Sequence, residues 1–396
     1  MRNQGAVAKH PPVPKKPREG NRVNGRRFRA SSVHAEFKKY PRDIRPLPRT
    51  GNLEQWGTGV TSMASIPLRS FGNSGQQISV LGLGGHHLGD AKDEVTAIQI
   101  VHEAVDGGIT FFDNCWEYNR GKSENWMGKG LKGLHDKVFL MTKVCTHGRD
   151  ATLATQMLDE SLRRLQTDHL DLWQIHGVSF DNDPDLFIRP GGAAEALTKA
   201  KQEGKVRFVG FTGHKAPEIH LKMLATGFPF DAVQMPLNAF DANFHSFEKL
   251  VLPELNKRNI AALGMKPFTG KGEPLKNGLR GLGVLSPEET LRYAMSLPVA
   301  TTITGMEKIE VLHQNLHIAQ NFTPMSPQEM DSLRQRCSKY AADGRYEHYK
   351  VSLPFDNPEA RLAHDFPIDS QQKEVKEMMR EATNTGLPFP DLNKWL

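Results

Sequence analysis

The sequence predicts a (β/α)8 TIM barrel, a fold of the α/β class, preceded by an N-terminal β-hairpin. Short apolar runs and helical patterns alternate eight times between residues 78 and 321, and this stretch is close to the ~250 residues of such a barrel. The apolar runs are continuous and bounded by turn residues, which suits parallel strands that are covered by helices.

The hairpin is expected within residues 66–80, where two extended runs flank the turn Gly72-Asn73-Ser74-Gly75. The barrel strands are expected at 78–85, 110–114, 138–144, 170–176, 206–213, 232–237, 261–267 and 300–306. The helices that follow them are expected at 93–106, 122–132, 151–166, 193–204, 216–226, 247–258, 287–296 and 308–320. Ser286 and Glu289 form a capping box that places the start of one helix at Pro287.

An open doubly wound sheet is the competing topology, and its hallmark is a G-x-G-x-x-G loop after the first strand. Here Gly82-Leu83-Gly84-Gly85-His86-His87 departs from that pattern at its last position. The eight strand–helix repeats therefore favour the closed barrel.

The barrel domain is expected to span residues 63–323, and residues 324–396 to form a helical and irregular extension that packs on it. Ser326 and Glu329 form a second capping box, which predicts a helix to about residue 341, and a polar helix is expected near 370–382. Because no further repeat follows residue 322, the extension is expected to wrap the barrel or cover its mouth.

Residues 1–62 differ from the rest of the chain in charge. They hold 14 Lys and Arg against 4 Asp and Glu, a net charge of +10, so the remainder carries −4 of the total +6. Rich in Pro and Arg and without an apolar block, this basic tail is expected to be disordered. The alternatives are a tether to nucleic acid or an acidic surface, an organelle transit peptide, and a true start at Met63.

The remaining composition is typical of a cytoplasmic protein. The apolar runs fall short of the ~20 residues that a membrane helix requires. Cys115, Cys145 and Cys337 show neither disulfide nor metal-ligand spacing. We therefore expect reduced thiols, no membrane segment, no nucleic-acid partner for the barrel and no metal, while the oligomeric state stays open.

Four polar residues stand at or just after the ends of three successive predicted strands: Asp113 and Tyr118, Lys143, and His176. The carboxyl ends of barrel strands form the active-site face, so these side chains are expected to meet. A phenol ionises only near pH ~10, and an ammonium beside it stabilises the phenolate and lowers its pKa. With a carboxylate to hold the ammonium and an imidazole to orient a substrate oxygen, the set predicts a proton-transfer site.

These residues resemble the aldo-keto reductase family over roughly residues 66–322. Asp113 to Tyr118, the following Gly121-Lys122-Ser123-Glu124, Lys143 and His176 come in the family's order. The resemblance implies an NAD(P)H-dependent oxidoreductase that transfers hydride between nicotinamide and a small carbonyl or alcohol substrate. It implies Tyr118 as general acid, Lys143 as modulator of its pKa, Asp113 as anchor of the lysine, and His176 as the group that orients the carbonyl.

The resemblance also implies a set of cofactor contacts. Thr212, Gly213 and Gln234 would lie near the nicotinamide carboxamide, with Gly213 in place of the usual Asn. Met265 replaces an aromatic residue that usually stacks on the nicotinamide, and Lys266 replaces a Ser near the pyrophosphate. The other candidates are Phe268, which continues that wall, and, on the adenosine side, Gly305, Met306, Gln314 and Asn315.

The residues expected near the adenosine do not all favour the same nucleotide, NADP(H) or NAD(H). NADP(H) is favoured by the family, but Val311 stands where a basic residue often grips the 2′-phosphate, and Glu307 adds a negative charge nearby. Lys308 is within reach, so NAD(H) is kept as the alternative. Since Cys337 is the one cysteine after the barrel, no iron–sulfur cluster is expected.

Two other functions fit the same residues: a nucleotide-bound regulatory module resembling potassium channel β-subunits, and an oxidative sugar or cyclitol dehydrogenase. The intact set of four polar residues favours an enzyme. Neither the substrate nor the physiological direction follows from the sequence, and Trp116, Cys145 and Trp173 are the expected walls of the substrate pocket.

Overall fold

The computed structural model describes residues 65–144, 149–269 and 283–351, and these residues contain a closed barrel of eight parallel strands. The strands follow one another around the barrel in chain order, and the last pairs with the first. The predicted (β/α)8 TIM barrel is confirmed. Its strands are β3 (Leu81–Gly84), β4 (Phe111–Asp113), β5 (Phe139–Val144), β6 (Leu170–Val178), β7 (Val206–Gly213), β8 (Ala232–Pro236), β9 (Ala261–Met265) and β10 (Thr301–Gly305).

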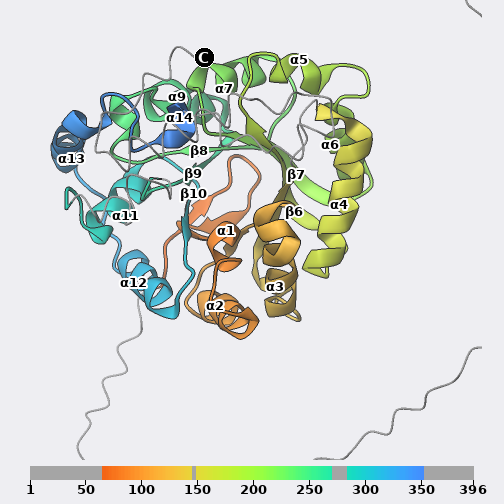
Figure 1. Ribbon diagram of the computed structural model, residues 1–396, viewed down its shortest axis with the longest axis horizontal. Coiled ribbons are helices and arrows are strands. Elements are labelled where there is room, and N and C mark those ends of the chain that lie inside the picture. The colour runs from red at the N-terminus through yellow and green to blue at the C-terminus, as the bar shows by residue number, and fades with distance from the viewer. Residues whose placement is uncertain (1–64, 145–148, 270–282, 352–396) are drawn as a thin grey trace, which may run out of the picture. The chain divides into compact units, whose positions relative to one another are not determined.

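Helices alternate with the strands and surround them (Figure 1). Those at predicted positions are α2 (Glu94–Asp106), α3 (Lys122–Gly130), α4 (Ala151–Leu165), α6 (Ala193–Gln202), α7 (Pro217–Ala225), α8 (Phe247–Leu250), α9 (Leu252–Arg258), α11 (Pro287–Ser296) and α12 (Ile309–Gln320). The capping box of Ser286 and Glu289 is present. The expected helix 247–258 is split at Val251 into α8 and α9, because Pro253 has no amide hydrogen to continue the helical hydrogen bonds.

Several short turns were not expected from the sequence because they are too short to show a period. They are α1 (Gly85–Leu88), η1 (Tyr118–Gly121), η2 (His135–Lys137), α5 (Asp183–Ile188) and η4 (Asp241–Asn243).

The predicted hairpin closes the amino-terminal end of the barrel. Its strands, β1 (Leu68–Ser70) and β2 (Gln77–Ser79), are antiparallel. Phe71, just after β1, places its ring 4.8 Å from that of Phe139, the first residue of β5, and 5.2 Å from that of Phe208. The opposite end of the barrel, where the strands finish, therefore stays available for a site.

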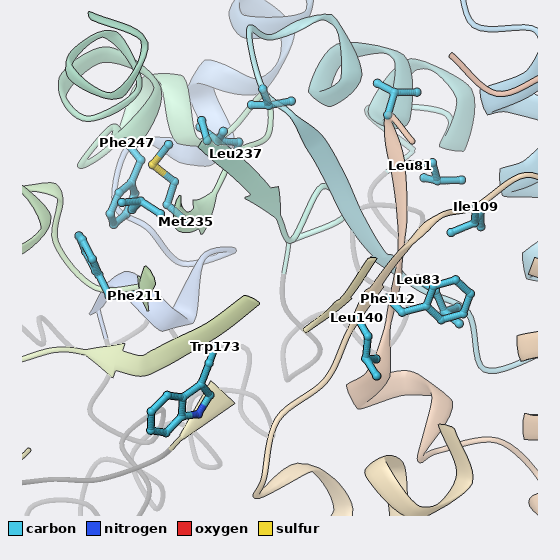
Figure 2. Packing of buried hydrophobic residues seen from close by; sticks show 14 of the residues in the cluster. Leu81, Leu83, Ile109, Phe112, Leu140, Trp173, Phe211, Met235, Leu237 and Phe247 are labelled. Atoms are coloured by element: carbon cyan, nitrogen blue, oxygen red, sulfur yellow. The ribbon is translucent and has the colours of Figure 1, made fainter. Parts of the chain in front are cut away.

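Successive strand residues face two separate hydrophobic cores, as a strand with a period of two residues requires. Phe111, Phe139 and Leu172 belong to a small core inside the barrel that includes the hairpin. Their chain neighbours belong to a larger core that also takes in the helices, and Figure 2 shows Phe112, Leu140 and Trp173 in it.

The chain after the barrel returns to the ends of its strands. It forms α13 (Pro327–Ala341), with the predicted capping box at Ser326, and α14 (His348–Val351). The fully buried Lys350 ammonium donates to Asp241 Oδ1 at 2.6 Å, to the Phe244 carbonyl at 2.7 Å and to Glu347 Oε2 at 3.1 Å. The basic tail and the helix expected near 370–382 lie outside the described residues.

Among the helices of the described ranges, none combines the length and the apolar character needed to cross a membrane.

Replacing Lys350 with Met is expected to destabilise the fold by about 3–5 kcal/mol, because it leaves two buried carboxyl groups without their cation. Chemical and thermal denaturation measure the loss. Lys249→Met, at an exposed position on α8, is the matched control and should change stability by less than about 0.5 kcal/mol. Equal stability of the two variants would contradict the claim that Lys350 stabilises the fold by pairing with Asp241 and Glu347.

Candidate active site

The four predicted residues meet at the carboxyl ends of β4, β5 and β6. Lys143 on β5 is fully buried and forms an ion pair with Asp113 at the end of β4. Its ammonium also donates to the Asn114 carbonyl at 2.9 Å and to the Tyr118 hydroxyl at 3.1 Å. The ring of His176 on β6 lies 5.9 Å from the ring of Tyr118, edge to face. The predicted meeting of these side chains is therefore present in the structure.

A layer of amides inside the barrel supports Asp113. Gln234 on β8 donates to Asp113 Oδ2 at 2.8 Å, and its own oxygen accepts from Gln174 on β6 at 2.8 Å. Both carboxylate oxygens of Asp113 are thus engaged, one by Lys143 and one by Gln234. Since a buried charge is costly unless it is paired and hydrogen-bonded, this layer is what allows the ammonium to be buried.

The loop that carries Tyr118 is held in an unusual backbone conformation. Asn119, Arg120 and Gly121 follow one another with φ of 52°, 57° and 80°. Left-handed residues other than Gly cost about 1–2 kcal/mol each. A hydrogen bond from the Asn119 side-chain amide to Asp90, 2.8 Å long, stabilises this backbone conformation and offsets part of the strain. The loop turns sharply at this point, and the Tyr118 hydroxyl lies beside Lys143.

His176 is in contact with two residues from the spacer between Asp113 and Tyr118. Its Nδ1 lies 2.9 Å from Glu117 Oε1 and 3.3 Å from Cys115 Sγ. Burial lowers the pKa of His176, but Cys115 and Glu117 outweigh it and raise that pKa to about 9. Neither residue was predicted as functional, because the contact joins positions about 60 residues apart in the chain.

The nicotinamide-side candidates lie on neighbouring strands β7, β8 and β9. Thr212 is buried, and its hydroxyl accepts from the Gly177 amide at 3.1 Å. A Cβ at Gly213 would lie 2.5 Å from His220 Cε1, so the buried His220 leaves no room for the Asn usual in the family. Gln234 supports Asp113, as described above.

The next candidate cofactor contacts lie at the end of β9 and in the loop that follows it. Met265 is buried in the inner core, and Phe268 packs against the outer one. The backbone turns sharply here, with φ of 55° at Lys266 and 61° at Thr269. Burial, followed by repulsion from Lys143, lowers the pKa of Lys266 to about 8, although Asp113 opposes this.

The adenosine-side candidates lie on β10 and α12. Gly305 is covered by His87, whose Nδ1 would lie 1.3 Å from a Cβ at that position, and Met306 is fully buried. Gln314 is exposed on α12. Asn315 is fully buried, yet its Nδ2 and Oδ1 have no hydrogen-bond partner within the described parts of the chain. A buried amide left unpaired in this way fits a ligand that completes its hydrogen bonds, and a nucleotide has suitable donors and acceptors.

One of the expected pocket walls is corrected by the structure. Trp173 faces the outer core, because Leu172 and Gln174 on either side of it face the barrel interior. Trp116 is half-buried, its Nε1 donates to Glu160 on α4 at 2.7 Å, and the guanidinium carbon of Arg164 lies 5.3 Å from its ring centroid; its place as a pocket wall stays a prediction. Cys145, the third expected wall, lies outside the described residues.

Comparison with known proteins identifies the family. A model of the Aldo/keto reductase family matches residues 80–289. The chain belongs to this family of oxidoreductases.

Individual curated relatives are similar to more than half of this chain. The uncharacterized oxidoreductase YqkF of Bacillus subtilis (strain 168) is 27% identical over 303 residues, which cover 67% of this chain and 95% of that protein. Aldo-keto reductase yakc [NADP(+)] of Schizosaccharomyces pombe is 28% identical over 52% of this chain and 62% of its own length. Two other curated relatives are matched over 50% and 60% of their length.

A solved structure shows the same fold. Aldo-keto reductase AKR11C1 from Bacillus halodurans in its holo form superimposes with a TM-score of 0.58 at 26% identity, covering 68% of this chain and 96% of that chain.

Replacing Asn315 with Leu, which has nearly the same shape, is expected to weaken nucleotide binding about 10-fold, the equivalent of one lost hydrogen bond. The ligand-free protein should lose no stability, because an unpaired buried amide is removed. Nucleotide titration and thermal melting measure the two effects. Asn256→Leu, exposed on α9, is the control, and unchanged affinity of the Asn315 variant would contradict the adenosine-side assignment.

Proposed function

We propose that the protein reduces an aldehyde or ketone with a reduced nicotinamide nucleotide, and that Tyr118 is the general acid. The observation that carries this proposal is the buried ion pair of Lys143 and Asp113 with the Tyr118 hydroxyl 3.1 Å from the Lys143 ammonium. Family membership supports the reaction class, and the contacts among the described side chains support the assignment of roles.

Each residue has a separate task in this proposal. When Tyr118 gives its proton to the oxygen of the substrate, negative charge develops on the phenol, and the Lys143 ammonium stabilises that charge. Asp113 neutralises Lys143 and orients it through their ion pair. His176 approaches the Tyr118 ring from β6, and it orients the carbonyl oxygen toward the hydroxyl.

The residues present fit a nicotinamide nucleotide. A reduced nicotinamide supplies hydride to the carbonyl carbon when it is bound. Thr212, Gly213, Gln234 and Met265 would hold the nicotinamide side, Lys266 and Phe268 the pyrophosphate side, and Gly305, Met306, Gln314 and Asn315 the adenosine side. The side-chain amide of Asn315, which has no hydrogen-bond partner among the described residues, and the cationic Lys266 near Lys143 support this placement, since a dinucleotide brings hydrogen-bonding groups and negative charge.

Replacing Tyr118 with Phe is expected to lower kcat by about 10²–10⁴-fold, the usual contribution of a general acid. Nucleotide affinity should stay nearly unchanged, because only a hydroxyl is removed. Loss of nucleotide absorbance against a panel of carbonyl compounds measures turnover, and fluorescence titration measures binding. Unchanged turnover of the variant would contradict the role of Tyr118.

We propose NADPH as the preferred nucleotide, with NADH as a weaker donor. The Schizosaccharomyces pombe relative is named for NADP(+), and the exposed Lys308 at the start of α12 offers a cation for the 2′-phosphate. Lys308→Ala is expected to reduce kcat/KM for NADPH about 5-fold or more and to leave NADH nearly unaffected. Steady-state kinetics with both nucleotides test this, and an equal loss with both would rule out Lys308 as the 2′-phosphate contact.

A further inference from the structure

Glu117 lies in the loop between Asp113 and Tyr118, and its carboxylate is in direct contact with His176. The Oε1 atom of Glu117 is 2.9 Å from His176 Nδ1, and the two side chains are 23% and 10% exposed. At this distance and degree of burial, the contact is a charge-assisted hydrogen bond that bulk water screens little.

This contact determines where the imidazole of His176 carries its proton. A carboxylate can only accept a hydrogen bond, so Nδ1 must be the donor to Glu117. A neutral imidazole bears one N–H, and that N–H is then on Nδ1. Under this constraint, Nε2 of a neutral His176 would present a lone pair, which repels a carbonyl oxygen. Only the imidazolium form has an N–H at Nε2.

We propose that Glu117 is a positioning residue that keeps His176 in the imidazolium form, so that Nε2–H can donate a hydrogen bond to the substrate oxygen beside Tyr118. The inference rests on the proposed function for the identity of that oxygen. It gives the site a positively charged donor in addition to the neutral phenol that Lys143 activates.

The charges around His176 are consistent with a cationic ring. Within the described chain, Lys143 is neutralised by Asp113, and Arg149, which donates to the His176 carbonyl at 2.8 Å, is paired with Asp183 at 3.0 Å. The ring of His214 lies 6.0 Å from that of His176.

The pKa of His214 is held well below its usual range by burial first and then by repulsion from Lys266, His176 and Lys143. His214 therefore stays neutral and does not compete for the proton. Burial lowers the pKa of His176, but Cys115 first and Glu117 next raise it to about 9, and the contribution of Glu117 has the sign that the proposed role requires.

Glu117→Gln isolates the charge of this residue, because the amide keeps the shape and can still accept from Nδ1 but bears no charge. The titration of His176 is followed by ¹⁵N NMR of histidine-labelled full-length protein, with His176→Asn used to assign the signal. We expect imidazolium in the wild-type protein to about pH 9, and a titration point about 1–2 pH units lower in Glu117→Gln. Glu117→Asp, which restores the charge, should recover most of the shift, and Cys115 is kept in every variant.

The pH profile of kcat gives the second readout. The imidazolium of His176 and the phenol of Tyr118 must both keep their protons, so turnover is lost as pH rises through the lower of their two titration points. The expected drop for His176 in Glu117→Gln should therefore move this basic limb to lower pH. The loss should fall on kcat and not on the KM for nucleotide. An unmoved NMR titration in Glu117→Gln, or a neutral His176 in the wild-type protein at pH 7, would overturn the inference.

The two proposals fail in different ways. If the NMR titration shifts as expected but no carbonyl compound is reduced by any form of the protein, the inference about Glu117 stands and the proposed reaction fails. If Tyr118→Phe abolishes turnover while the Glu117→Gln profile matches the wild type, the reaction stands and the role of Glu117 fails.

Discussion

The structure of the site depends on one buried cation, the ammonium of Lys143. A charged group taken out of water into a protein interior costs several kcal/mol unless it is paired and hydrogen-bonded. Asp113 supplies the opposite charge and the Asn114 carbonyl a further acceptor. Gln234 donates to the second oxygen of the Asp113 carboxylate, and Gln174 holds Gln234 in place by donating to its side-chain oxygen. The Tyr118 hydroxyl accepts the third hydrogen bond of the ammonium, and in the proposed function this hydroxyl is the proton donor.

The barrel stabilises the buried ion pair of Lys143 and Asp113 because its interior is divided into two layers along the strands. At the amino ends, the hairpin residue Phe71 closes a small apolar core with Phe111 and Phe139. At the carboxyl ends, inward positions become polar: Lys143 on β5 lies two residues beyond Met141, and Gln174 on β6 two residues beyond Leu172. The period of two residues therefore places an apolar floor beneath the polar layer. Water is excluded from below, which strengthens every charged contact above.

Much of the fold was predictable because local rules and the tertiary structure agree. The capping boxes at Ser286 and Ser326 begin α11 and α13 as expected, and the Gly72–Gly75 turn joins β1 to β2. The split between α8 and α9 follows from Pro253, a local signal that the sequence itself contains. Trp173 was assigned to the wrong face, although counting back by twos from an inward His176 places it outside the barrel.

Other features of the site depend on partners that are distant in the chain, and no local pattern reveals them. Trp116 turns to α4 because Glu160 and Arg164 are there. At Gly213, His220 from the following helix and the Val178 carbonyl occupy the space that any larger side chain would need. Glu117 is one residue before Tyr118, but its partner His176 is on another strand. The cofactor residues stay predictions, and their best structural support is the buried amide of Asn315, which no side chain or backbone group in the described ranges pairs with.

The most direct measurement of the central claim is an ultraviolet titration of tyrosinate in the wild-type protein, Tyr118→Phe and Lys143→Met. If the Lys143 ammonium stabilises the Tyr118 phenolate, one tyrosine ionises clearly below pH ~10 in the wild type. Tyr293 and Tyr349 do not interfere, because burial raises the pKa of both phenols. The early-ionising component should be absent in Tyr118→Phe and displaced to higher pH in Lys143→Met. An identical titration of all three proteins would contradict the account.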